Sequence, residues 1–119
     1  KKIVVIIDEI SDLMLQDKSG NFKKALLGLA QKCRAAGIYL VISTQRPSAK
    51  IISGDIKANF LARIACKVAS KIDSKIILDE SGAEDLIGKG DAIIKNYDLD
   101  FKRFKFCYFD LNMIKQIVK

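Results

Sequence analysis

An acidic pair directly follows an apolar run near the start of the chain. Asp8 and Glu9 come after Ile3–Ile7, whose unbroken β-branched residues are typical of a strand buried on both faces of a parallel sheet. An open α/β sheet presents its ligand crevice at the carboxyl ends of its strands. Two carboxylates at that edge suit nucleotide hydrolysis, because the first can orient Mg²⁺, often through water, while the second polarises the attacking water. The pair alone is a weak signal, since an Asp after a strand commonly caps a helix.

The remaining pattern supplies the elements that would position this pair. Residues 22–33 place apolar side chains on one helical face, with Asn21 as the expected N-terminal cap and Gly37 as the expected C-terminal cap. A second apolar run, 38–43, completes a strand–helix–strand unit whose crossover should be right-handed. The later elements that we expect are a short helix at 55–60, strands at 62–68, 91–94 and 103–109, and a last helix that Asp110 caps. The predicted class is α/β, with a mostly parallel sheet flanked by helices and an antiparallel edge strand toward the C-terminus.

Composition and charge narrow the function classes. The 119 residues, enough for one domain, carry a formal net charge of +7, which favours polyanionic partners, although solvated surface lysines explain the same excess. The absence of histidine excludes Ser-His-Asp and Cys-His catalysis and imidazole-ligated metals. Cys33, Cys66 and Cys107 lie far apart among apolar residues, so we expect buried, reduced thiols and a cytoplasmic setting. Every apolar run is well short of the ~20 residues of a membrane span.

Several linked motifs resemble those of the FtsK/SpoIIIE family of DNA translocases. Residues 3–14 resemble its Walker B segment, and residues 29–38 and 43–48 resemble the motifs that follow. Similar matches continue in order through 56–59, 70–79 and 82–91. Linked motifs over most of the chain are far more specific than any one of them. The resemblance implies that residues 1–119 are the second half of a RecA-like P-loop ATPase core.

The resemblance implies roles for residues around the acidic pair. Asp8 would orient Mg²⁺ and Glu9 would be the catalytic glutamate. Thr44 and Gln45 end the neighbouring strand, where they would contact the γ-phosphate and position water, with ordinary loop hydrogen bonds as the alternative. Arg34 would act in trans on ATP held by the next subunit of a ring, because a permanently charged guanidinium stabilises the transferred phosphoryl group. The alternative for Arg34 is a surface arginine at a helix C-terminus.

Basic residues would contact the substrate of such a motor. By resemblance, Arg46, Lys57, Lys71 and Lys75 lie on loops that face a central pore and bind DNA phosphates, as stepping along any sequence requires. Lysine stands at 71 and 75 where arginine is familiar in the family, which keeps the charge but loses the bidentate fork. The alternative for each is an ordinary solvated side chain.

Two features lie closer to the C-terminus. Residues 88–91 are expected to form a tight turn near the nucleotide-binding face, with Gly90 and Asp91 as candidate nucleotide contacts. The resemblance fades from residue 94 onward, where a different loop and the basic, aromatic strand 103–109 depart from the family pattern. Its aromatic side chains suit edge packing better than base stacking.

The chain contains no phosphate-binding loop of the form G-x-x-x-x-G-K-[ST]. Because that loop supplies most of the affinity for phosphates, we expect that the isolated chain neither binds ATP tightly nor hydrolyses it. The leading hypothesis is part of an ATP- and Mg²⁺-dependent ring, by resemblance a hexamer, that moves double-stranded DNA in chromosome segregation or in plasmid or conjugative transfer. The alternatives are a ring ATPase that moves protein in secretion and a non-catalytic binding or assembly module. We expect no membrane contact by this chain, and an anchor of the parent protein would lie outside it.

Overall fold

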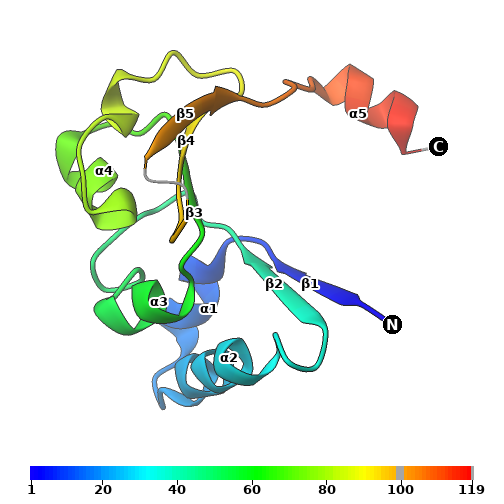
Figure 1. The fold of residues 1–119 in the computed structure, drawn as a ribbon, viewed down its shortest axis with the longest axis vertical. Coiled ribbons are helices and arrows are strands. Elements are labelled where there is room, and N and C mark those ends of the chain that lie inside the picture. The colour runs from blue at the N-terminus through cyan, green and yellow to red at the C-terminus, as the bar shows by residue number, and fades with distance from the viewer. Residues whose placement is uncertain (99–100, 119) are drawn as a thin grey trace. The chain divides into compact units, whose positions relative to one another are not determined.

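The computed structural model describes residues 1–98 and 101–118, and it confirms the α/β class. The chain divides into two compact units, Lys1–Leu61 and Ala62–Lys119. The first unit contains β1 (Ile3–Ile7), α1 (Ile10–Gln16), α2 (Asn21–Lys32), β2 (Ile38–Ile42) and α3 (Gly54–Asn59) (Figure 1). The second contains β3 (Arg63–Cys66), α4 (Lys71–Leu78), the 3₁₀ helix η1 (Ala83–Asp85), β4 (Asp91–Lys95), β5 (Lys102–Lys105) and α5 (Leu111–Ile117). Within the described ranges, no helix is both long enough and apolar enough to cross a bilayer.

In the first unit, β1 and β2 pair in parallel, as Figure 1 shows, with Ile7 beside Ile42 at their carboxyl ends. The connection between them runs through α1, which the sequence pattern did not predict, and α2. Ile7 and Ile42 pack against a buried cluster from the helices and from the loop before α3. The cluster comprises Ile10, Leu26, Ile51 and Ile56. The apolar core therefore holds the carboxyl ends of both strands, which is where the acidic pair lies.

The strands β1 and β2 are covered on one face only. Ile6 is 71% exposed and Val41 is 50% exposed, whereas Val5 and Leu40, which point to the other face, are partly buried. The prediction of a strand buried on both faces is therefore wrong for this chain, because the helices of the first unit cover only one side of its sheet. An unbroken apolar run indicates that a strand suits apolar surroundings on both faces, but it does not indicate which residues would cover each face.

In the second unit, β3, β4 and β5 form an antiparallel sheet in that order. The antiparallel part of the fold is thus larger than the single edge strand that we expected. Residues 63–66 alternate in exposure, as a strand with one solvated face does. The buried face of this sheet packs against α4 and η1 through Ala65, Leu78, Ala83, Leu86 and Ile93.

Two predictions about element ends are corrected. Asn21 does not cap α2 but is its first residue, and the Lys23 amide instead donates to the Asp17 carboxylate at 3.0 Å. That bond holds the pKa of Asp17 below its ordinary value. The strand expected over 103–109 ends at Lys105, because its pairing partner β4 begins at Asp91 and beyond the Phe106 amide, which bonds to the Gly90 carbonyl, there is only a turn to pair with. The cap at Asp110 is confirmed, since its carboxylate accepts from the first amides of α5.

The expectation of three buried thiols is also only partly met. Cys33 is buried, but Cys66 and Cys107 are exposed. Cys66 is the last residue of β3 and lies on the solvated face of that strand, while Cys107 follows the end of β5. Apolar neighbours in sequence therefore do not guarantee burial at the edge of a small sheet. The expected loop after β4 is described only in part, because Leu99 and Asp100 lie outside the described residues.

Candidate functional site

Backbone pairing brings the ends of β1 and β2 together. Beyond the last paired residues, the Ser43 amide donates to the Ile7 carbonyl at 3.0 Å, and the Ile10 amide donates to the Ser43 carbonyl at 2.9 Å. These two bonds continue the pairing past the strands, so residues 8 and 9 lie beside residues 43–45. The candidate site forms because two apolar runs end at matched positions in one parallel register.

Glu9 is held by two donors from the end of β2. The Thr44 hydroxyl donates to Glu9 Oε1 and the Gln45 backbone N–H donates to Oε2, each at 2.8 Å. The Gln45 amide, and after it the Thr44 hydroxyl, hold the pKa of Glu9 below its ordinary value. The carboxylate is therefore charged at neutral pH and fixed in direction. Gln45 makes this contact through its backbone N–H, and a role of its side-chain amide toward the γ-phosphate or water stays a prediction.

The backbone of Glu9 is itself in an uncommon conformation. Its φ of 48° and ψ of 65° lie in the left-handed region, which costs roughly 1–2 kcal/mol for a residue with a side chain. Such conformations persist where the surrounding structure fixes them, and they gather at functional sites. Here the carbonyl of Ser43 fixes the chain on one side of Glu9, since it accepts the Ile10 amide.

The carboxylate of Asp8 is suited to be one of the ligands of a magnesium ion. Its Oδ1 accepts from the Ser43 hydroxyl and, at 3.1 Å, from the Glu9 N–H, while the side chain as a whole is exposed. Across residues 1–98 and 101–118 there is no cluster of three or more His, Cys, Asp or Glu residues that could hold a metal. Mg²⁺ in phosphoryl-transfer sites uses one or two carboxylates together with phosphates and water. Asp8 meets that requirement as one ligand, directly or through water.

Two serines in this site were missed by the sequence interpretation. Ser43 bonds to Asp8, and the buried Ser11 bonds through its hydroxyl to the hydroxyl of Thr44. Both are small polar residues that flank the expected site residues in sequence, one directly before Thr44 and one two positions after Glu9. That proximity was the available signal.

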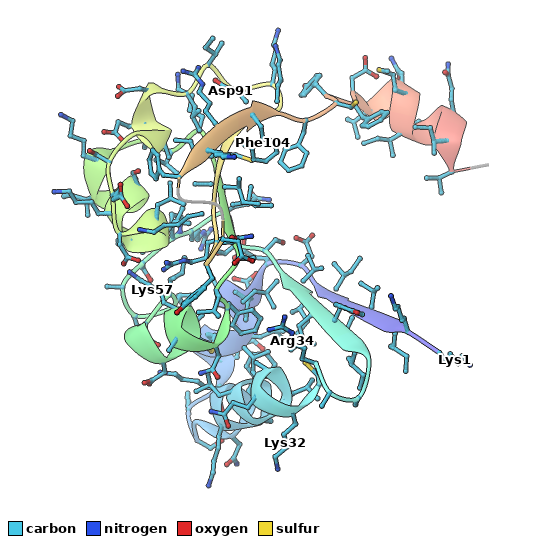
Figure 2. All side chains as sticks on the ribbon, viewed as in Figure 1. Lys1, Lys32, Arg34, Lys57, Asp91 and Phe104 are labelled. Carbon is cyan, nitrogen blue, oxygen red and sulfur yellow. The ribbon has the colours of Figure 1, made fainter. Side chains whose placement is uncertain are left out.

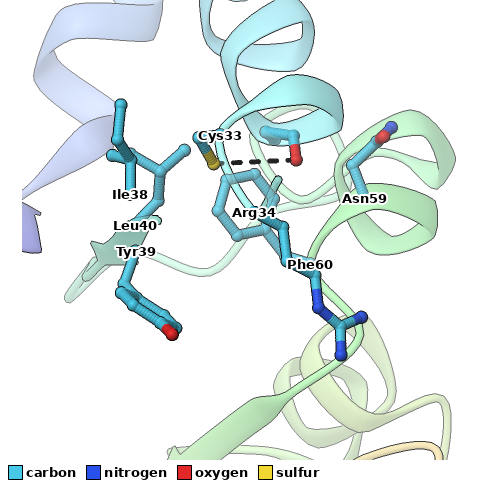
Figure 3. Close-up of a pocket in the computed structure, with 8 residues that line it drawn as sticks. Cys33, Arg34, Ile38, Tyr39, Leu40, Asn59 and Phe60 are labelled. Atoms are coloured by element: carbon cyan, nitrogen blue, oxygen red, sulfur yellow. Dashed lines mark hydrogen bonds between the residues drawn. The ribbon is translucent and has the colours of Figure 1, made fainter. Parts of the chain in front are cut away.

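Arg34 was expected on the helix before Gly37, but it lies in the turn that follows α2, which ends at Lys32, and its side chain is exposed. It lines a hollow of about 190 Å³ together with Cys33, Tyr39, Asn59 and Phe60 (Figure 3). Within the part of the chain that the structure describes, no carboxylate pairs with its guanidinium. This surface position is compatible with a group that reaches another molecule, and the role in trans stays a prediction.

The four candidate DNA contacts occur in both units. Arg46 is exposed in the loop after β2, and its amide donates to the Thr44 hydroxyl oxygen at 3.1 Å. Lys57, Lys71 and Lys75 were expected on loops but lie in helices, the first in α3 (Figure 2) and the other two in α4. The reason for α4 is local, because the Ser70 hydroxyl caps its N-terminus by accepting the Asp73 amide. Contact of these residues with DNA stays a prediction.

Gly90 and Asp91, the candidate nucleotide contacts, have structural roles in the second unit. The expected tight turn is present, with the Asp91 amide donating to the Gly88 carbonyl at 3.2 Å. A Cβ at Gly90, whose φ is +90°, would lie 2.4 Å from the Phe106 carbonyl oxygen, so only glycine allows this close approach. Asp91, labelled in Figure 2, is buried, and its carboxylate accepts from Arg103 Nε at 3.0 Å and from Arg103 Nη2 at 2.7 Å. A nucleotide contact by either residue stays a prediction.

We predict that the Asp91–Arg103 pair makes the second unit acid-sensitive. The Arg103 guanidinium, helped by the Ile87 amide, lowers the pKa of Asp91 from 3.8 to about 2. Because the folded-state pKa is depressed, the stabilisation is complete above pH 3.8 and is lost as the pH falls from there toward 2. Asp91→Asn should therefore speed hydrogen exchange in β4 and β5 at neutral pH and remove most of the acid dependence of that exchange over this interval. Asp98→Asn, an exposed carboxylate in the same unit, is the control, and equal effects of the two substitutions would contradict the prediction.

Comparison with solved structures defines the class of protein. The conjugation coupling protein TcpA of pCW3, solved in a monomer form with ATPγS, superposes with a TM-score of 0.81 at 36% identity, over 100% of this chain and 38% of that one. The cytoplasmic domain of the type VII secretion ATPase EccC from Thermomonospora curvata gives a TM-score of 0.79 over 90% of this chain and 12% of that one. The second likeness, at 21% identity, concerns the fold alone. The chain thus has the fold of part of a P-loop ATPase motor domain.

Sequence comparison then confirms the resemblance to the FtsK/SpoIIIE family. The model of that family matches residues 1–49. The DNA translocase FtsK of Chlamydia muridarum is 54% identical over 92 residues, which are 77% of this chain and 12% of that protein. The DNA translocase FtsK of Streptococcus agalactiae is 53% identical over 96 residues, 81% of this chain and 12% of that protein. The chain therefore spans about one eighth of the length of these relatives, 12% in each case.

Proposed function

We propose that this chain is part of an ATP-driven motor that moves double-stranded DNA. The observation that carries the proposal is the meeting of Asp8 and Glu9 with Thr44 and Gln45 at the carboxyl ends of two parallel strands. The fold supports ATP as the fuel, and the similarity to proteins named DNA translocases supports DNA as the substrate. The chain would work within a longer protein that supplies the phosphate-binding loop, as part of a ring that is hexameric by resemblance.

In the proposed reaction, ATP would supply the phosphoryl group that is transferred. Mg²⁺ would supply the positive charge that neutralises the phosphoryl oxygens. Asp8 would help to hold the metal with its exposed carboxylate. Glu9 would accept a hydrogen bond from the attacking water, because each of its oxygens accepts one protein donor and keeps a further lone pair. Thr44 and Gln45 fix the direction of that carboxylate, and Arg34 of a neighbouring copy would stabilise the developing charge.

The proposed substrate is the phosphate backbone of duplex DNA. Arg46, Lys57, Lys71 and Lys75 would contact phosphates without reading sequence. We propose a cytoplasmic location for the chain and a role either in chromosome segregation or in plasmid or conjugative transfer. The likeness to a conjugation coupling protein is the reason for keeping transfer as a candidate. An isolated chain without the phosphate-binding loop should not hydrolyse ATP.

The test is ATP hydrolysis by the intact motor with and without duplex DNA. We expect DNA to raise the turnover number severalfold, and we expect this stimulation to fall as salt rises, because bound cations are released when basic residues neutralise phosphates. Turnover that ignores DNA would instead favour a motor that moves protein. A protein that binds DNA but shows no turnover would favour the non-catalytic binding module.

A further inference from the structure

Ser11 is a buried hydroxyl that neither the motifs nor the comparisons assign to the site. It is the second residue of α1, its side chain is 1% exposed, and its hydroxyl bonds to the hydroxyl of Thr44. A buried hydroxyl is costly unless it is hydrogen-bonded, so this partner explains how the residue is tolerated. The same hydroxyl also lies 3.4 Å from the Arg46 carbonyl oxygen, a longer and weaker contact.

The direction of the Ser11–Thr44 bond follows from the available protons. Thr44 has one hydroxyl proton, and it points to Glu9 Oε1 at 2.8 Å. Toward its other neighbours the Thr44 oxygen can only accept, and it accepts from the Arg46 amide at 3.1 Å. Ser11 is therefore the donor in its bond to Thr44. The result is a directed chain in which Ser11 donates to Thr44 and Thr44 donates to Glu9.

We propose that Ser11 is a positioning residue that acts through Thr44 to fix the carboxylate of Glu9 for hydrolysis. The inference rests on the proposed function of Glu9. Ser11 occupies one lone pair of the Thr44 oxygen. The hydroxyl proton of Thr44 therefore points toward Glu9. With the Arg46 amide on the second lone pair, the Thr44 hydroxyl is held on every side.

The loop after β2 offers a readout that needs no nucleotide. The Gln45 amide is bonded to Glu9 and the Arg46 amide to Thr44, so hydrogen exchange at these two amides reports on the network itself. In the intact nucleotide-free protein, Ser11→Ala should speed exchange at both amides about fivefold or more, the effect of losing one net hydrogen bond. Exchange in the second unit should not change.

Activity supplies the second readout. Ser11→Ala should lower kcat about tenfold while the KM for ATP changes less than twofold, because a misdirected carboxylate impairs the chemical step and not binding. In a protein that already carries Thr44→Val, which removes the hydroxyl at nearly constant volume, Ser11→Ala should have no further effect on kcat. That lack of additivity is the mark of two residues that act as one unit.

Ser74→Ala is the matched control, since Ser74 is also a fully buried helical serine whose hydroxyl makes two hydrogen bonds, to the Glu80 carbonyl and from the Ala83 amide. It should speed exchange around α4 and leave basal kcat within about twofold. Equal kcat losses for both serines, or independent effects of Ser11 and Thr44, would overturn the proposal. Wild-type protein without turnover would overturn the proposed function and, with it, the role of Ser11 in hydrolysis. The exchange result would still show whether Ser11 fixes the loop, which separates the two failures.

Discussion

Glu9→Gln is expected to lower ATP hydrolysis by the intact motor by about 10²–10⁴-fold, the usual contribution of a general base. ATP binding should be nearly unchanged, because Glu9 contacts Thr44 and Gln45 and the proposed role assigns it to the water, not to the nucleotide. Rings would then stay bound to DNA with unhydrolysed ATP. Single-turnover hydrolysis together with equilibrium nucleotide binding measures the two effects separately.

The structure adds a reason for the size of this effect. Two donors point at the Glu9 carboxylate, the Thr44 hydroxyl and the Gln45 N–H. A glutamine has only one acceptor oxygen, so its amide nitrogen must face one of these donors. Neither the Gln45 amide nor the Thr44 hydroxyl, which Ser11 and the Arg46 amide hold in place, can easily turn away, and the neutral side chain also loses the charge that both donors stabilise. Glutamine therefore changes both the basicity and the direction of the group.

Asp12→Asn provides the control for this experiment. Asp12 is an exposed carboxylate in the first turn of α1, three residues from Glu9, and it undergoes the same chemical change. It should leave turnover within about twofold, as most exposed substitutions do. Unchanged hydrolysis in Glu9→Gln would remove Glu9 from the catalytic role, and equal losses in both variants would point to misfolding or to a general effect of removing a negative charge.

The centre of the candidate site could be predicted because it depends on local pattern. The acidic pair ends one apolar run and Thr44 follows another, and strands joined by a helical crossover run parallel, so their carboxyl ends meet. The lengths and spacing of the two apolar runs were enough to predict that these residues lie close together. Their contact in the structure follows from the matched ends of the two runs.

Other parts of the site depend on details that pattern does not contain. The bond from Gln45 to Glu9 comes from the Gln45 backbone, whose direction is set by the turn after β2 and could not be read from the sequence. Ser11 was missed because α1 was missed, since seven residues give too little periodicity to reveal a helix. The positive φ of Glu9 is likewise imposed by tertiary pairing, because glutamate has no local preference for it.

The region around Gly90 and Asp91 has contacts that the sequence pattern does not contain. In the structure Asp91 pairs with Arg103, and Gly90 allows the close approach of Phe106, while a nucleotide contact by either residue stays a prediction. Both partners are more than ten residues away in sequence and lie beyond the motifs. An ion pair across two strands could not be predicted without their register.

The last prediction concerns Arg34 and asks whether the site is completed by a neighbouring copy. Arg34→Ala should lower turnover by about 10³-fold or more, the contribution of an arginine finger. Lys32→Ala is the control, because Lys32 is an exposed cation two residues earlier, at the end of α2. It should leave turnover within about twofold. Loss of activity in Arg34→Ala alone would not distinguish a role within one subunit from a role between subunits.

Mixing two inactive variants makes that distinction. An Arg34→Ala subunit keeps Glu9, and a Glu9→Gln subunit keeps Arg34, so an interface between them in the right order contains one intact copy of each residue. If Arg34 acts in trans, equal amounts of the two inactive proteins should regain about a quarter of the wild-type rate when subunits mix at random and sites act independently. If Arg34 acts within its own subunit, no mixed ring contains a complete site and the mixture stays inactive. Exchange of subunits must be shown with differently labelled proteins, because rings that do not mix would also stay inactive. An inactive mixture of freely exchanging subunits would therefore assign Arg34 to a role within its own subunit.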